Sequence, residues 1–409
     1  MRTTRSGRIV AALGCSLAML LAVGCSNAGE TDTPGEQVTI DVWDYEGQGV
    51  SNDAMEAAVA AFEKANPDIK VKRTSFAFAD LSKSIVQGGV GGEVPDVAII
   101  DNVDNQNFAA LGLLADITDA VGNRKAEYFE GPWSSTQLEG KTFGLPMNSN
   151  NLALFYNKTM FAEAGIDAAP ATWDELADVS KKLATADRSG LALSGVKNEQ
   201  GTFQVLPFVW QTGGDLDNFA ESGAKALSFL KSLIDDGGMS SAVANYSQED
   251  ARTQFTTEKT AMMVNGPWEI ANLDDVEFEW AVAPLPKDKE AATGLGGENI
   301  VAFAEAKHPE QALKFVEFMA SKDGVQTFCD VSGQLSPRPD LEGKLKLSTD
   351  PNMQVFEKQM ADTHARAYGE NYNKISELVQ IAIQEALTGA KTPEDAASAA
   401  FEQIKPLLP

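Results

Sequence analysis

Apolar and polar residues alternate from Val38 to Trp43, which is the period of a strand with one buried face. Farther along, the spacing becomes that of a helix, with Met55 and Phe62 on one face. The run 97–100 is wholly apolar and predicts a strand buried on both faces, as in parallel sheets. Because strands alternate with helices in this way, the chain is predicted to have an α/β fold.

Polar or aromatic positions follow three of the predicted strands. Asp101 comes directly after the apolar run, and the loop 43–49 follows the first strand. Open α/β sheets bind ligands at the carboxyl ends of their strands, so both are candidates for a binding site. Trp268 lies shortly after a strand-like run, 261–264, where an aromatic side chain often lines a site. Packing in the core is the alternative for Trp268.

The composition limits the size of the cores and the kinds of partner. With 409 residues, of which 43% are hydrophobic, the chain can bury two ordinary cores, so two lobes are predicted. Its formal net charge of −26 would repel nucleic acid and anionic lipid. The same charge favours a neutral or cationic ligand only weakly, because a solvated acidic surface explains it more simply. We expect a monomer that binds no nucleic acid.

The residue types that most catalytic sites need are scarce. Only two histidines occur, His308 and His364, and no cysteine cluster lies beside them. We therefore expect no metal site, no cofactor and no histidine-based active site. The sequence contains no phosphate-binding glycine loop, nucleophile elbow or HExxH motif. A glycosidase remains the enzymatic alternative, since some pair among the 59 acidic residues will always suggest one.

Residues 1–24 are predicted to be an export signal that is removed, because three arginines precede an uncharged run over residues 9–23. This run is shorter than the about 20 apolar residues that a membrane-spanning helix needs. Residues 21–25 resemble the lipobox of bacterial lipoproteins, which implies that Cys25 becomes the lipidated first residue of the mature chain. The stretch 25–37 is rich in Thr, Gly, Pro and acidic residues and predicts a flexible tether.

Several blocks, in order along most of the mature chain, resemble the family 1 extracellular solute-binding proteins, the lipoprotein receptors of bacterial ABC importers for sugars. The blocks are FEKANPDIKV (62–71), GKTFGLP (140–146) with LFYNK (154–158) and PATWDEL (170–176), residues 255–262 with GPW (266–268), and GG (296–297). Each block alone is weak, but their common order behind a lipoprotein signal is specific.

The resemblance implies two α/β lobes, joined by crossing strands, that close on a ligand in the cleft between them. One lobe is expected at 38–146 plus 278–322 and the other at 148–275 plus 323–409. The crossings near residues 146, 275 and 322 would form the hinge. The implied protein is lipid-anchored on the outer side of the bacterial cell membrane and passes its sugar to the permease subunits of an ABC transporter.

Aromatic rings cover the apolar face of a sugar, while carboxylates, amides and arginine bind its hydroxyl groups. The family pattern places six residues of this kind in the cleft: Glu46, Asp101, Asn150, Trp268, Glu298 and Arg338. Five more have suitable chemistry: Trp43, Tyr45, Asn148, Trp210 and Asn265. Trp43 could instead belong to the core, and Arg338 could pair with a surface acid. Glu298 stands where the family often has an aromatic residue, which suggests hydrogen bonding there in place of stacking.

The predicted function is capture of a neutral mono- or oligosaccharide for import, without catalysis. Within binding proteins, the alternative is a non-sugar solute such as a polyamine or a phosphorylated polyol. A polyamine site would need more carboxylates than aromatic residues. The alternatives from other classes are a secreted glycosidase and an interaction module for a partner protein.

Overall fold

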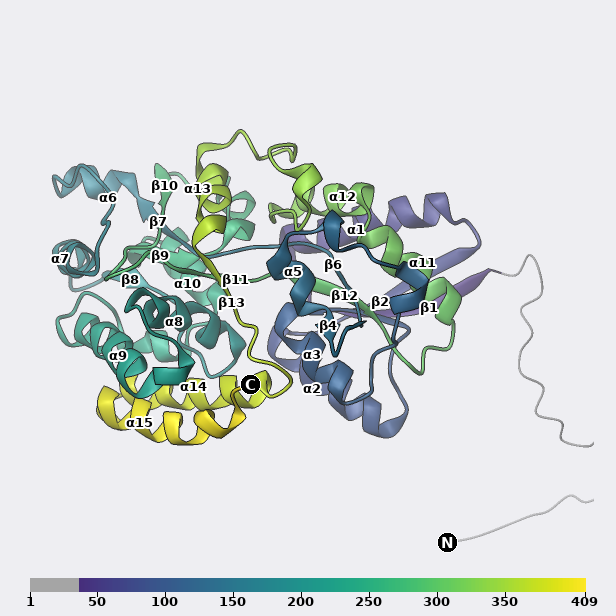
Figure 1. Cartoon of the computed structure of the whole chain (residues 1–409). Coiled ribbons are helices and arrows are strands. Elements are labelled where there is room, and N and C mark those ends of the chain that lie inside the picture. Colours follow the sequence, from purple (N-terminus) through teal and green to yellow (C-terminus); the bar gives the residue numbers. More distant parts are fainter. Residues whose placement is uncertain (1–36) are drawn as a thin grey trace, which may run out of the picture. The chain divides into compact units, whose positions relative to one another are not determined.

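A computed structural model describes residues 37–409, in which two β-sheets are each packed against helices (Figure 1). The predicted export signal, Cys25 and the tether up to residue 36 lie outside the described residues. No helix within 37–409 is long and apolar enough to cross a membrane.

The first sheet has five strands and is mostly buried. Its order is β2 (Ile69–Ser75), β1 (Val38–Asp44), β3 (Val97–Asp101), β12 (Glu298–Ala302) and β6 (Leu145–Pro146). Strand β1 runs parallel to β2 and β3, whereas β12 is antiparallel to β3 and β6. The alternation in β1 and the complete burial of β3 confirm the two strands predicted from the sequence.

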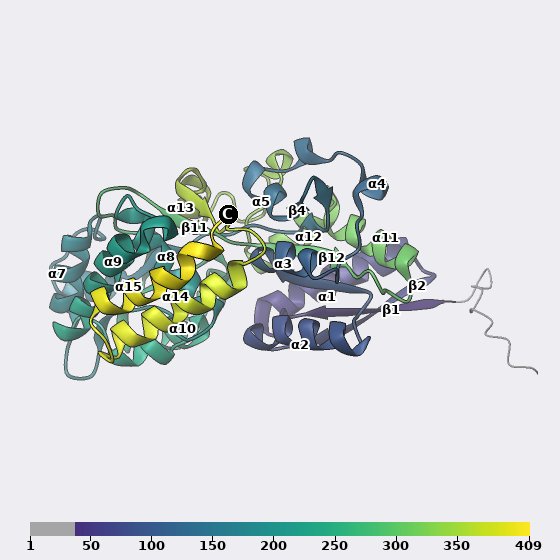
Figure 2. The same cartoon turned by 60° about the horizontal axis from the view of Figure 1, so that its bottom comes forward.

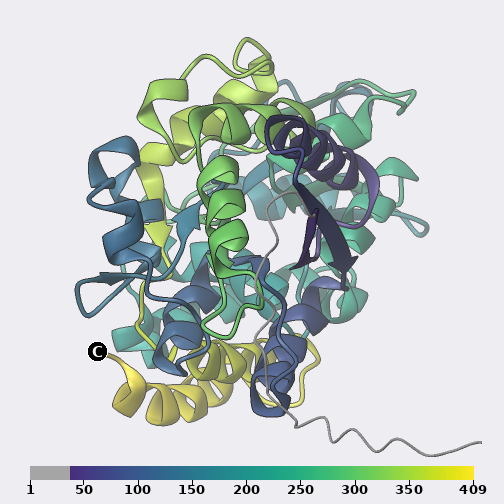
Figure 3. The same cartoon turned by 90° about the vertical axis from the view of Figure 1, so that its right-hand side faces the viewer.

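Helices cover both faces of this sheet. Successive side chains of β3 point to opposite faces, so they enter two different cores. Val97 and Ile99 enter a core with α1, α11 and α12, while Ala98 and Ile100 enter another with α2 and α3. Figures 1 and 3 show α2 on the opposite side of the sheet from α1 and α12. The helices are α1 (Gly49–Ala65), α2 (Phe78–Gly91), α3 (Asn105–Ala110), α11 (Pro309–Met319) and α12 (Lys322–Ser332).

The second sheet has four strands, in the order β10 (Trp280–Ala283), β7 (Ala153–Asn157), β9 (Thr260–Asn265) and β8 (Ser189–Ala192). Its larger core contains α7 (Trp173–Leu183), α8 (Glu199–Gln211), α9 (Phe219–Asp235), α14 (Tyr372–Leu387) and α15 (Pro393–Ile404). Figure 2 shows α14 and α15 side by side on the near face of this part. On the other side of the sheet lie α10 (Gln248–Thr256) and α13 (Pro351–Gln359).

The chain passes between the two sheets more than once, which confirms the predicted two-lobed fold with crossover segments. It leaves the first sheet after β6, returns between β10 and β12, and leaves that core again between α12 and α13. Backbone bridges join Asn150 to Gly296 and Ser149 to Leu335, so three crossing segments lie side by side.

Two segments pack in a different lobe from the one predicted for them. Residues 280–283 form β10, which is antiparallel to β7 in the second sheet, although we expected residues from 278 in the first lobe. Residues 322–332 form α12, whose Val325 and Phe328 are buried in the core of the first sheet, although we expected residues from 323 in the second lobe. Both differences arise because tertiary packing, not local pattern, assigns these elements to a core.

Candidate functional site

A cavity of about 680 Å³ lies where the ends of the two sheets meet, within the size range of about 300–1,000 Å³ that is typical of ligand sites. The first sheet contributes the loops after β1 and β2, the end of β3 and the start of β12. The other side contributes the starts of α8 and α10 and the segment after β9. The loops after parallel strands therefore line the cavity, as the α/β pattern predicted.

Six of the eleven candidate residues line this cavity: Tyr45, Glu46, Asp101, Asn150, Trp268 and Glu298. They come from both sheets and from a crossing segment between them. The structure thus brings together aromatic, carboxylate and amide side chains from both lobes.

Glu298 lies at the start of β12 and is held by its neighbours. The Tyr45 hydroxyl donates a hydrogen bond to Glu298 Oε1 at 2.9 Å, and Asn148 Oδ1 accepts one from the Glu298 backbone N–H at 3.0 Å. Burial, and then the charge of Glu46, raise the pKa of Glu298 to about 8. Burial, together with the charge of Asp44, raises the pKa of Glu46 to about 7. Both carboxyl groups can therefore gain or lose a proton near neutral pH.

Arg366 connects the two sides of the cavity. Its Nη2 donates to Asp101 Oδ1 at 3.2 Å, and its Nη1 donates to Glu199 Oε1. Asp101 ends β3 of the first sheet, whereas Glu199 begins α8 of the second lobe. The guanidinium also lies 4.4 Å from the centre of the Phe203 ring, as in a cation–π contact. Because the Arg366 side chain is only 2% exposed, this ion triad is well shielded from water.

Trp268 is half-buried at the cavity wall, in a short 3-10 turn, Pro267–Glu269, that follows β9. Its indole lies against Gly266, where an added Cβ would come within 2.0 Å of the ring. A side chain at position 266 would therefore push the indole out of place. Asn265 supports this turn, because its Nδ2 donates to Glu269 Oε1 at 3.2 Å, but Asn265 does not line the cavity.

Four other candidates also lie outside the cavity lining. Trp43 packs on Phe76 with ring centres 5.0 Å apart, and Asn148 contributes only through the backbone of Glu298. Trp210 is 2% exposed and donates from Nε1 to Asp215 Oδ1 at 2.9 Å, so it belongs to the core.

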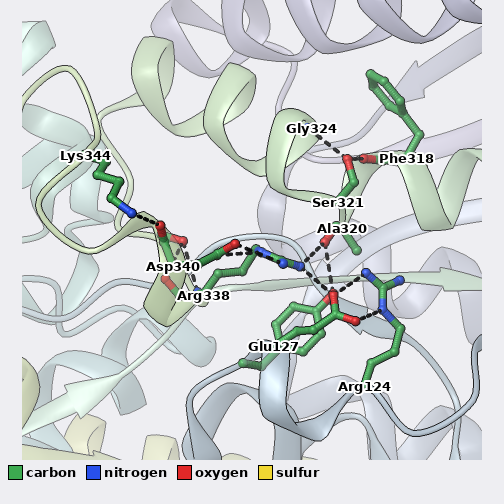
Figure 4. Close-up of polar contacts among 11 residues, drawn as sticks. Arg124, Glu127, Phe318, Ala320, Ser321, Gly324, Arg338, Asp340 and Lys344 are labelled. Atoms are coloured by element: carbon green, nitrogen blue, oxygen red, sulfur yellow. Dashed lines mark hydrogen bonds and ion pairs between the residues drawn. The ribbon is translucent and has the colours of Figure 1, made fainter.

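Arg338, the fourth of these, is engaged elsewhere (Figure 4). Its Nη1 donates to Glu127 Oε2 at 3.0 Å and to the carbonyl oxygen of Ala320 at 3.2 Å, and its Nε donates to Asp340 Oδ1 at 3.1 Å. These contacts hold the chain after α12 against the segment before α5 (Glu130–Ser135). Arg338 is thus a partner of acidic side chains, which was the alternative for this residue.

Sequence reasoning missed several residues of the cavity wall, notably Phe203, Gln334, Glu199 and Arg366. Phe203 lies in a helix whose residues from 200 to 211 are all buried, so no periodicity marks it. Arg366 reaches the site only because β13 (Thr363–Ala365) pairs with β11 (Thr293–Leu295). Within 37–409, no group of three His, Cys, Asp or Glu side chains is arranged to hold a metal ion.

Two α/β lobes that share a polar and aromatic cavity define a ligand-binding protein of the periplasmic-binding type. The family model described as "Bacterial extracellular solute-binding protein" matches residues 48–326, and the chain belongs to this family. Its members are binding proteins and not enzymes.

Relatives support the same class over nearly the whole chain. The multiple sugar-binding protein of Streptococcus mutans is 26% identical, with 95% of this chain and 96% of that protein covered. An ABC transporter solute-binding protein from Thermotoga lettingae, bound with α-D-tagatose, has a TM-score of 0.84 at 28% identity and covers 91% of this chain and 100% of its own. The maltose-bound MalE3 of T. maritima has a TM-score of 0.82 at 26% identity, with 91% and 100% covered.

Proposed function

We propose that this protein is the substrate-binding lipoprotein of an ABC transporter, which captures a mono- or oligosaccharide in the cavity and delivers it to the membrane permease. The observation that carries the proposal is the lining of the cavity. Trp268 offers an apolar ring for a sugar face, while Glu298 and Asn150 offer hydrogen-bonding groups for its hydroxyls. The sugars named for the relatives support the same ligand class.

A polyamine is the second candidate, because six carboxylates and five aromatic residues line the cavity. A thermal-shift panel of sugars and polyamines separates the two, since a ligand at 100 times its Kd stabilises the protein by about 2.7 kcal/mol. Stabilisation by sugars supports the proposal, whereas stabilisation by polyamines alone contradicts it. Release of product from a chromogenic glycoside would instead indicate a glycosidase.

We expect Trp268→Ala to weaken sugar binding while leaving the fold nearly intact. A stacked aromatic ring contributes about 0.5–1.5 kcal/mol beyond its buried area, which corresponds to about twofold to tenfold in affinity. The measurement is calorimetric affinity for the sugar found by the panel, together with the melting temperature of the ligand-free protein.

Trp280→Ala is the matched control, because Trp280 is also half-buried but packs on Phe155, outside the cavity lining. It should leave sugar affinity unchanged. A Trp268→Ala protein that melts far below the parent yet binds normally would show that Trp268 only packs.

The proposed anchor is Cys25, and the mature protein is proposed to be a monomer on the outer face of the cell membrane. Replacing Cys25 with alanine should release the protein from the membrane fraction without changing its sugar affinity, because the lipid attachment point is lost. Fractionation after a salt wash, followed by immunoblotting, measures this. A Cys25→Ala protein that stays fully membrane-bound would rule out this anchor.

A further inference from the structure

Three crossing segments bring buried acceptor atoms to the cavity wall. Glu298 Oε2, Asn150 Oδ1 and Gln334 Oε1 have no hydrogen-bond partner among the described residues, and each side chain belongs to a residue that is more than nine-tenths buried. These residues are neighbours because Asn150 bridges to Gly296 and Ser149 bridges to Leu335. Buried acceptors without donors are costly, so the group that occupies this place must donate hydrogen bonds.

The charges at this place point to a cation. Glu298 and Glu46 are both buried, and neither forms an ion pair with a described residue. The arginine beside Glu46, Arg73, is engaged with Asp44, since its Nε lies 2.8 Å from Asp44 Oδ2 and its Nη2 lies 3.1 Å from Oδ1.

The two arginines that line the cavity are also engaged with other acids. Arg366 pairs with Asp101 and Glu199, and Arg252 pairs with Glu269 at 3.2 Å. Glu298 and Glu46 are therefore left without an ion-pair partner among the described residues, in a cavity open to ligand.

We propose that the sugar bound here carries a protonated amine, whose ammonium group binds at Glu298 and Glu46 with an amide oxygen of Asn150 or Gln334 completing its contacts. An ammonium group has three donors and no acceptor, which matches this set of atoms. A hydroxyl group would supply a donor but no positive charge, whereas an ammonium group would also stabilise the ionised form of the two carboxyl groups, whose pKa values of about 8 and about 7 leave them partly protonated near neutral pH. The inference rests on the proposed function, narrows the ligand to amino sugars, and departs from the neutral ligand expected from the sequence.

Calorimetry with matched sugars at pH 7 tests the inference. Each neutral sugar is paired with its amino counterpart, such as glucose with glucosamine, galactose with galactosamine, and cellobiose with the glucosamine disaccharide. At least one amino sugar should bind about tenfold or more tightly than its neutral partner, because its hydrogen bonds to a carboxylate are charge-assisted. Glu298→Gln and Glu46→Gln keep the shape of the side chains. Each should bring the ratio of the amino-sugar affinity to the neutral-sugar affinity close to one.

Glu249→Gln is the matched control, since Glu249 lines the same cavity but is exposed, and it should leave the ratio unchanged. Neutral sugars that bind as tightly as their amino partners would overturn the inference and leave sugar binding standing. A preference for amino sugars that survives in both glutamine variants would also overturn it, because the attraction would then come from general negative charge. If no sugar of either series binds, the inference and the proposed function both fail.

Discussion

Replacing Arg366 with methionine is expected to lower the free energy of unfolding by about 3–5 kcal/mol, since removing one partner of a buried ion pair leaves uncompensated charge. The guanidinium is shared by Asp101 and Glu199, so its loss leaves both carboxylates in a shielded place. The decrease in the free energy of unfolding should be larger at pH 8 than at pH 5. Burial already raises the pKa of Glu199, and without Arg366 this carboxyl group can take up a proton as the pH falls.

Denaturant unfolding of the ligand-free protein at both pH values measures this effect. The double variant Arg366→Met with Glu199→Gln should recover part of the lost stability, because one of the two uncompensated carboxylate charges is removed. Arg366→Lys keeps the charge but not the planar fork, and should fall between the parent and Arg366→Met. A loss below about 1 kcal/mol, as for a surface pair, would show that the triad does not join the lobes energetically.

Trp210→Ala should cost about 3–5 kcal/mol of stability, which is typical of truncating a core tryptophan. The indole is almost fully buried, its Nε1 donates to Asp215, and its ring stacks on His364 with centres 5.1 Å apart. Truncation would leave a large void and remove one of the hydrogen bonds that Asp215 Oδ1 accepts, the others coming from the Leu216 backbone N–H and the Tyr368 hydroxyl. Denaturant unfolding again gives the free energy, and calorimetry gives the affinity of the folded protein.

The expected pattern is the reverse of that for Trp268→Ala, which should lose affinity and keep stability. Trp210→Phe is the matched control, because it keeps a ring in the same space and should lose less stability than Trp210→Ala. A Trp210→Ala protein as stable as the parent but deficient in sugar binding would return Trp210 to the list of binding residues.

The sequence predicted well the elements whose pattern is local. The alternation in Val38–Asp44 correctly predicted a strand with one buried face, and the unbroken apolar run before Asp101 correctly predicted a strand buried on both faces. This works because the spacing of apolar residues reflects which faces of a strand are buried. The assignment of elements to lobes was less accurate. Nothing in the pattern of 280–283 or 322–332 says which core will receive the apolar face of each segment.

In the candidate site, too, the residues marked by a local pattern were predicted and those brought in by long-range contacts were not. Asp101, Glu46 and Trp268 follow strand ends, and the structure places all three at the cavity. Arg366 and Gln334 come from segments far along the chain that reach the site through long-range pairing, which local spacing cannot reveal. Trp210 and Arg338 have suitable chemistry for a sugar, but side-chain type alone does not distinguish a core ring or a structural ion pair from a ligand contact.

The bridges between the crossing segments have a mechanical consequence. Three separate strands would let one lobe twist, slide and tilt against the other, and each of these freedoms would cost entropy when a ligand fixed the lobes. The backbone bridges from Asn150 to Gly296 and from Ser149 to Leu335 join the crossing segments into one narrow ribbon, which we expect to bend more easily in one direction than in the others. If the lobes move mainly along one direction, ligand binding has to restrict fewer motions of the protein. The entropic cost of binding is then smaller and the affinity is higher.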